Sequence, residues 1–94
     1  MPSSLHSPDY QLFRSMLIEA RTNSGLTQTQ IAETLVKPQS YVSKYERGER
    51  RIDFPEFMEL ANVLKIDVEV FVNNYKTALA ATKVQKIRRT SKAS

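Results

Sequence analysis

The chain of 94 residues has no cysteine, no tryptophan, two glycines and a single histidine. The absence of cysteine excludes disulfides, thiolate chemistry and the usual cysteine-built zinc sites. His6 lies in a leader that contains Ser and Pro, so a solvent-facing side chain is its expected role rather than a metal ligand. We therefore predict neither a metal ion nor a cofactor.

Long apolar runs are also missing. Nowhere do 18 apolar residues follow one another, and residues 1–8 lack both the basic cluster and the apolar run of a signal peptide. The sequence therefore favours a soluble cytoplasmic protein without a membrane partner. It has no histidine in the folded part, no Gly-rich phosphate loop and no paired carboxylates in an evident pocket, so neither enzyme activity nor catalytic residues are predicted.

Helical periodicity is the main feature that is present. Hydrophobic residues make up 40% of the chain, which suffices for one core, and they recur at spacings of three and four rather than in alternation. We expect an all-α, compact five-helix domain over residues 9–82. A flexible leader over 1–8 and a basic, frayed tail over 83–94 should flank it.

Cap signals predict where the helices begin and end. Thr27 with Gln30, and Asp53 with Glu56, have the spacing of a capping box, in which each residue bonds the backbone N–H of the other. Gly25 suits the end of a preceding helix. The predicted helices are 10–23, 27–35, 39–47, one from 53 and one from 67.

Positive charge is distributed unevenly along the chain. The last twelve residues carry +5 while the whole chain carries +4, so the remainder is slightly acidic. Within that remainder, residues 37–51 are locally about +3, and the acidic Asp53, Glu56 and Glu59 follow. A basic segment beside an acidic one suits a face that approaches phosphates, although a merely solvated surface has the same composition. Charge alone leaves both interpretations open.

Two short helices joined by a tight turn are predicted in the middle of the chain. Residues 27–35 and 39–47 are separated only by Val36-Lys37-Pro38. A turn this short makes the helices cross steeply, which suits the small Ala32 at the crossing. The apolar side chains expected between the two helices are Ile31, Leu35 and Val42.

A string of motifs at fixed spacing runs through this region. The motifs are Gly25-Leu26-Thr27-Gln28, Ile31-Ala32, Leu35, Gln39-Ser40-Tyr41-Val42-Ser43-Lys44, Glu46-Arg47-Gly48 and the capped fourth helix. With them, residues 13–72 closely resemble the phage-repressor and Cro-type helix-turn-helix family, also called the XRE family. The resemblance implies a lambda-repressor-like fold and sequence-specific binding of double-stranded DNA as a transcription regulator, with the third helix in the major groove.

The resemblance also implies roles for individual side chains. Gln39 has the donor and acceptor pair that can read adenine, and Lys44 can donate to guanine. Gln28 matches a phosphate-bonding position at the amino end of a helix. Arg21 and Glu46 match positions that pair between the first and third helices. The implied base contacts are Gln39, Ser40, Ser43 and Lys44, and the implied phosphate contacts are Gln28, Lys37, Tyr41, Arg47, Arg50 and Arg51.

Two positions depart from the family pattern. Members usually have glycine where this chain has Val36, and a left-handed backbone there costs a β-branched residue about 1 to 2 kcal/mol. Either the turn is strained or its geometry has shifted. Pro38 lacks the capping hydroxyl often found at its position, but its ring presets the turn.

One recognition helix reads only a few base pairs, so a nucleoid-associated homodimer on a roughly palindromic operator is expected. The fifth helix offers Phe71, Tyr75 and Leu79 as a dimer surface, although the same stripe can complete the monomer core. The alternative function is an antitoxin-like or bridging adaptor whose main partner is another protein, on which the basic tail folds. In the first hypothesis the tail is either an arm along phosphates or a solubilising end.

Overall fold

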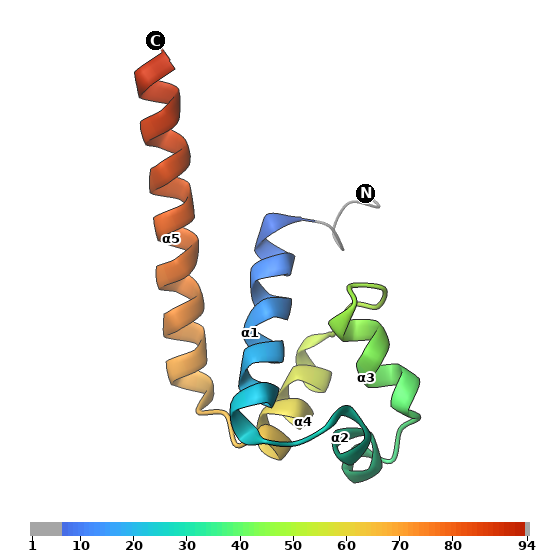
Figure 1. Cartoon of the computed structure of the whole chain (residues 1–94). Coiled ribbons are helices and arrows are strands. Elements are labelled where there is room, and N and C mark those ends of the chain that lie inside the picture. The colour runs from blue at the N-terminus through green and yellow to red at the C-terminus, as the bar shows by residue number, and fades with distance from the viewer. Residues whose placement is uncertain (1–6, 94) are drawn as a thin grey trace.

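The computed structural model describes the backbone of residues 7–93 and the side chains of residues 7–82. Within these ranges the chain forms α-helices and no strand (Figure 1). The all-α, five-helix prediction is therefore confirmed. The helices are α1 (Pro8–Ser24), α2 (Gln28–Leu35), α3 (Gln39–Glu46), α4 (Phe54–Leu64) and α5 (Val68–Ala93).

Local caps set the helix ends. Both expected capping boxes are present: Thr27 accepts from the N–H of Gln30 at 3.1 Å, and Asp53 accepts from that of Glu56 at 2.8 Å, with the return bond made in each case. Gly25 ends α1 in the left-handed conformation, with φ 79°. Helix α1 begins two residues earlier than predicted because the Ser7 hydroxyl caps it and Pro8 suits the first turn.

The core lies where α1 to α4 meet. Leu17, Ile31, Val42, Tyr45 and Leu60 are fully buried there. These residues come from all four helices, and two of them, Ile31 and Val42, join the two halves of the helix-turn-helix. The orientation of α3 therefore depends on the packing of the whole domain.

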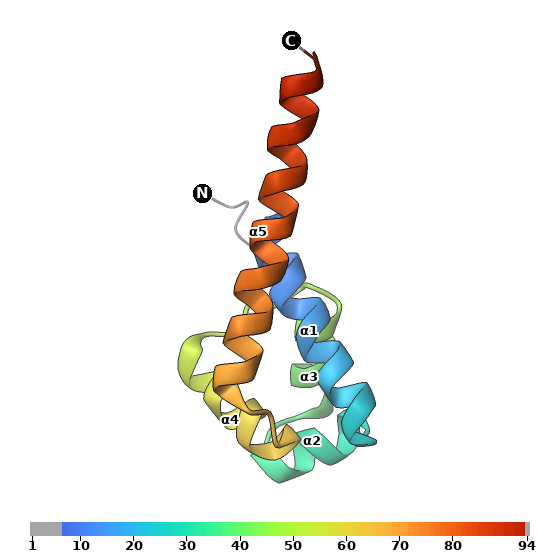
Figure 2. The same ribbon diagram turned by 90° about the vertical axis from the view of Figure 1, so that its left-hand side faces the viewer.

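Aromatic rings attach α5 to this core. The rings of Phe13, Phe57 and Phe71 lie with centroids 5.1 to 6.0 Å apart, in tilted or edge-to-face geometry. The Tyr75 hydroxyl donates to the carbonyl of Asp9 at 2.9 Å. Figure 2, which is viewed from the side of α5, shows the start of α5 in front of α1 and α4. Phe71 is thus a core residue, and Tyr75 contributes to the same monomer packing.

Helix α5 continues past the N-terminal end of α1 (Figure 1). The predicted frayed tail falls on residues 83–94, whose side chains lie outside the described part of the chain. Most of the predicted leader, His6 included, also lies outside it. None of the described helices combines the length and the apolar character needed to cross a lipid bilayer.

Candidate nucleic-acid interface

The turn between α2 and α3 has left-handed backbone at Val36, with φ 56° and ψ 49°. The N–H groups of Val36 and Lys37 bond the carbonyls of Glu33 and Ala32 at 3.1 and 2.9 Å, which satisfies the end of α2. Val36 is 90% exposed, so no packing compensates the strain at this β-branched residue. The sequence left open a strained turn or a shifted geometry, and the left-handed backbone at Val36 shows that the turn is strained.

An ion pair ties the end of α3 to α1. Arg21 Nε lies 2.6 Å from Glu46 Oε2, and its Nη2 donates to Oε1 at 3.1 Å, so the pair is bidentate. Glu46 is only 8% exposed. The hydrogen bond from Arg21 to Glu46 is also the main cause of a raised pKa at Arg21. In such a low-dielectric site, the pair fixes the direction of α3 as well as its distance from α1.

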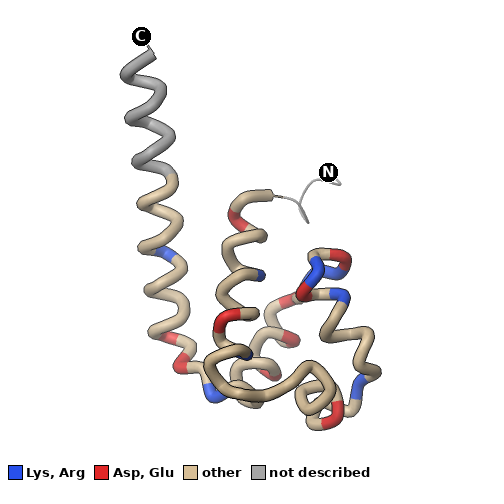
Figure 3. The backbone as a smooth tube through the Cα atoms, in the orientation of Figure 1, with Lys and Arg blue, Asp and Glu red and all other residues tan. Residues whose placement is uncertain are grey.

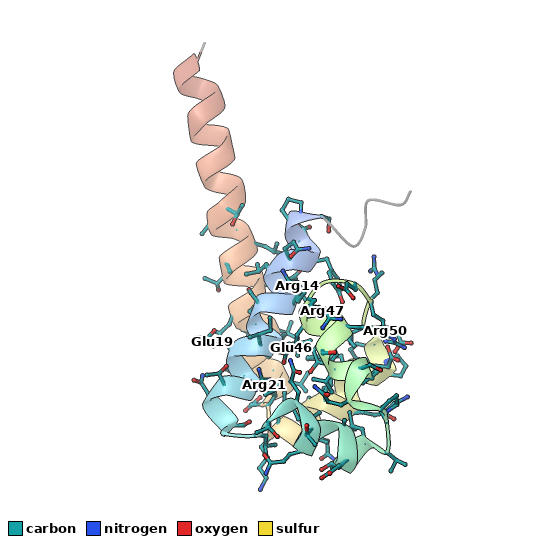
Figure 4. All side chains as sticks on the ribbon, turned by 45° about the vertical axis from the view of Figure 1, so that its right-hand side comes forward. Arg14, Glu19, Arg21, Glu46, Arg47 and Arg50 are labelled. Atoms are coloured by element: carbon teal, nitrogen blue, oxygen red, sulfur yellow. The ribbon has the colours of Figure 1, made fainter. Side chains whose placement is uncertain are left out.

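A second arginine, Arg14, bonds the backbone at the same end of α3. Its Nη1 donates to the carbonyl of Glu46, and its Nε donates to Gln11 at 3.0 Å. Figure 4 shows Arg14 and Arg21 on either side of Glu46, between α1 and α3. A Cβ at Gly48 would lie 3.4 Å from Arg14 Nε, which favours glycine there in addition to its φ of 78°.

The sequence analysis missed Arg14 as a residue that positions α3. It lies seven residues before Arg21, which places both on one face of α1. That spacing was visible in the sequence. Its partner was not, because a backbone carbonyl 32 residues away leaves no signature in residue types.

A chain of amides extends from Glu46 to the start of α3. Gln28 Nε2 donates to Glu46 Oε1 at 2.8 Å, and Gln39 Nε2 donates to Gln28 Oε1 at 3.0 Å. Gln28 is half-buried and Gln39 is exposed. The buried carboxylate therefore orients, through Gln28, an amide on the outer surface of α3.

The outer face of α3 carries the side chains expected to contact bases. Gln39, Ser40 and Lys44 are exposed, and Ser43 is partly exposed. The opposite face is buried and contains Tyr41, Val42, Tyr45 and Glu46. All four expected base-contact side chains thus lie together on the accessible part of α3.

Tyr41 differs from its predicted place as a phosphate contact. Its side chain is buried, with Lys37 Nζ 5.0 Å and Arg50 Cζ 4.7 Å from the ring centroid. Burial raises the pKa of Tyr41 to about 12. The reason is helical geometry, because positions 41, 42 and 45 share the inward face of α3. The ring supports two cations by cation–π contact and does not face solvent itself.

Acidic partners accompany two of the three arginines after α3. Arg47 pairs with Glu49 at 3.0 Å, and both side chains are more than half exposed. Arg50 pairs with Glu56 at 2.7 Å, and Glu56 also closes the capping box of α4. Arg51 instead lies over the ring of Tyr10, 5.1 Å from its centroid. Figure 3 shows the mixture of basic and acidic residues in this loop.

The pairs differ in how readily they can open. The Arg47–Glu49 pair is in high-dielectric surroundings and is worth little. The Arg50–Glu56 pair is partly shielded and contributes to a helix cap, and the hydrogen bond from Arg50 is the main cause of a lowered pKa at Glu56. Arg47 can therefore release its acidic partner more readily than Arg50.

Two short helices with a three-residue turn, and a polar face held outward by a buried carboxylate, define a helix-turn-helix protein of the DNA-binding class. The Helix-turn-helix family matches residues 17–71. Among solved structures, an XRE-family like protein from Pseudomonas syringae pv. tomato str. DC3000 shares 35% identity, with a TM-score of 0.72 over 83% of this chain and 98% of that chain. No match was found among curated proteins.

The chain belongs to the XRE family of helix-turn-helix proteins. Membership makes it a DNA-binding transcription regulator. The resemblance stated from the sequence motifs is thereby confirmed.

Proposed function

We propose that this regulator binds a specific double-stranded DNA sequence by inserting α3 into the major groove. The observation that carries the proposal is the outward grouping of Gln39, Ser40 and Lys44 on a helix whose far end is held by two arginines of α1. The major groove admits one helix, and its base edges present distinct patterns of donors and acceptors.

Gln39 is the side chain best prepared to read a base. Its contact with Gln28 orients the amide before DNA arrives, so less side-chain freedom is lost on binding. An oriented glutamine amide can donate to N7 and accept from N6 of adenine. Lys44, one to two turns further along α3, reaches guanine acceptors, while Ser40 and Ser43 serve as adaptable donors.

Phosphate contacts come from both ends of the motif. Gln28 Nε2 uses one hydrogen for Glu46 and has a second to donate, next to the free N–H groups at the start of α2. Lys37 lies at the turn and Arg47 at the end of α3, so the three flank the reading face. Arg50 and Arg51, held by Glu56 and Tyr10, contribute mainly to the local field.

We further propose that two copies bind a palindromic operator. A single α3 contacts only a few base pairs, and twofold symmetry doubles the length of the site without a second reading element. Specificity then grows with the square of what one copy achieves.

The experiment is selection of bound fragments from random DNA with the full chain. The expected result is an enriched sequence made of two half-sites related by twofold symmetry. Gln39→Ala should lose discrimination at one position of each half-site, whereas Asn73→Ala, an exposed amide on α5, should leave it unchanged. Failure to enrich any sequence would refute the proposal.

A further inference from the structure

The chain reverses direction directly after α3, at Gly48, whose φ is 78°. The N–H of Gly48 bonds the carbonyl of Tyr45 at 3.2 Å, and the N–H of Glu49 bonds the carbonyl of Lys44 at 2.8 Å. These two bonds are those of a Schellman motif, in which a left-handed residue ends a helix. They hold the backbone of Glu49 beside the last turn of α3.

The Glu49 carboxylate forms a bidentate pair with Arg47. Nε and Nη2 of Arg47 each donate to one of its oxygens at 3.0 Å. The hydrogen bond from Arg47 is the main cause of a lowered pKa at Glu49, and the positive charges of Arg47 and Lys44 lower it further. An ionised carboxylate thus lies in the field of two cations that belong to the proposed DNA interface.

Glu49 differs from the two other acidic partners of arginines in its role in the fold. Glu46 is buried, and Glu56 closes the cap of α4. The Glu49 side chain is 53% exposed, and within residues 7–82 Arg47 is its one hydrogen-bonding partner. An exposed pair of this kind contributes little to the stability of a fold. The carboxylate therefore acts mainly on what Arg47 can bind.

We propose that Glu49 limits the affinity of the protein for double-stranded DNA, whatever the sequence of that DNA. This role rests on the proposed function, because it requires the C-terminal end of α3 to lie against the phosphate backbone. Arg47 can meet a phosphate there in two ways, and Glu49 weakens binding in both.

In the first way, Arg47 exchanges Glu49 for the phosphate. A carboxylate and a phosphate both accept bidentate bonds from a guanidinium, so they compete for it. The released carboxylate stays beside α3, because its backbone is bonded to Lys44, and it repels the DNA. In the second way, Arg47 keeps Glu49 and reaches the phosphate through Nη1. The two side chains then bring no net charge to the DNA.

The effect of Glu49 is independent of sequence, since neither the pair nor the repulsion involves a base edge. Glu49 should therefore lower the affinity for the operator and for other DNA by the same factor. Contacts to phosphates supply nearly all of the affinity for DNA that lacks the operator. The carboxylate thus reduces occupancy of such DNA, while Gln39 and Lys44 still determine which sequence is preferred.

The test compares Glu49→Gln with the wild type by fluorescence anisotropy on a random-sequence duplex, from about 0.05 to about 0.5 M salt. Glutamine keeps the shape of the side chain and removes its charge. The variant should bind at least about threefold more tightly at the lowest salt. Its plot of log affinity against log salt should be steeper by about 0.9 for each bound copy, because one more phosphate charge is neutralised.

Glu19→Gln is the matched control, since it removes the same charge from another exposed side chain. Glu19 lines a hollow between α1 and α5, and Figure 4 shows it on the side of α1 away from Arg47. This variant should change the affinity less than about twofold, because salt screens a distant charge. Circular dichroism should show that both variants remain helical.

Three results would overturn the role of Glu49: an unchanged salt dependence in Glu49→Gln; an equal gain in Glu19→Gln, which would assign the effect to net charge; or weaker binding by Glu49→Gln, which would mean that the carboxylate orients Arg47 toward DNA. Selection of bound fragments tests the proposed function separately. A gain in Glu49→Gln without any enriched sequence would support the role of Glu49 and refute sequence-specific binding. An enriched operator with no gain would refute the role of Glu49 alone.

Discussion

Helix α1 stabilises its two neighbours by different physical means. Toward α3 it presents Arg14 and Arg21, which make directional, charge-assisted hydrogen bonds to Glu46. Toward α5 it presents Phe13, whose ring packs on Phe71 with little directional constraint. Aromatic burial contributes more free energy, while bidentate charge pairs define an orientation more narrowly. Helix α3, which we propose to read DNA, is thus the one held by hydrogen bonds.

The largest expected effect comes from disrupting the aromatic contact between α1 and α5. Phe71→Ala should lower the free energy of unfolding by about 4 kcal/mol, because it removes a buried ring and leaves a cavity. Urea denaturation measures the change. Val70→Ala, on the exposed face of the same helix, is the control and should change stability by under about 1 kcal/mol. A loss as small in Phe71→Ala would mean that α5 is not anchored by this ring.

Disrupting the ion pair between α1 and α3 should lower the free energy of unfolding by a smaller amount, but it should reduce the discrimination between DNA sequences. Glu46→Ala leaves Arg21 without its partner and should destabilise the fold by about 3 kcal/mol. It also releases Gln28 and Gln39, so discrimination between operator and mutated operator should fall at least about tenfold among the folded molecules. Glu49→Ala removes an exposed pair and should leave both quantities unchanged. Full discrimination in Glu46→Ala would contradict the orienting role of the carboxylate.

Val36 and Lys65, the two described non-glycine residues with left-handed backbone, allow the cost of β-branching to be measured. Val36→Gly should raise the free energy of unfolding by about 1 kcal/mol, since relief of β-branched strain exceeds the added flexibility of glycine. Lys65 has the same conformation at the end of α4, with φ 58°, but is not β-branched. Lys65→Gly should therefore gain less. Melting temperatures measure both variants, and equal gains would show that branching is not the cause.

The smallest expected effect is a change in the stability of the fold at low pH. The hydrogen bond from Arg50 holds the pKa of Glu56 below its usual value. This contribution to stability is complete above the unfolded-state pKa and is lost as the pH falls through the lower folded-state pKa. The stability difference between wild type and Glu56→Gln should accordingly narrow between pH 7 and pH 3. Denaturant titrations at the two pH values measure this stability difference. A difference that does not change with pH would show that Glu56 stabilises the fold as a helix cap and not through its charge.

The parts of the molecule that could be predicted from sequence are those determined locally. Thr27 and Asp53 identify helix starts because a capping side chain bonds a backbone group only three residues away. The strain at Val36 was one of two possibilities raised by the family pattern at that position, and the positive φ decides between them. Family motifs added the partnership of Arg21 with Glu46, which no local rule would have provided.

The features that were missed depend on tertiary packing. Tyr41 was expected at the surface as a phosphate contact. Its ring is instead covered by Lys37, which precedes α3, and by Arg50, which follows α3. For Phe71 the sequence left both a dimer surface and the monomer core open, and the buried ring shows that it belongs to the core.

Because Gln39, Ser40 and Lys44 project from the domain without filling it, their replacement leaves the scaffold intact. Under the proposed function, mutations at these three positions change which operator is bound while the domain still folds. Position 46 has no such freedom, since its carboxylate serves the scaffold and the reading face together. The proposed function therefore predicts that new binding preferences can arise through a few surface changes that the fold tolerates.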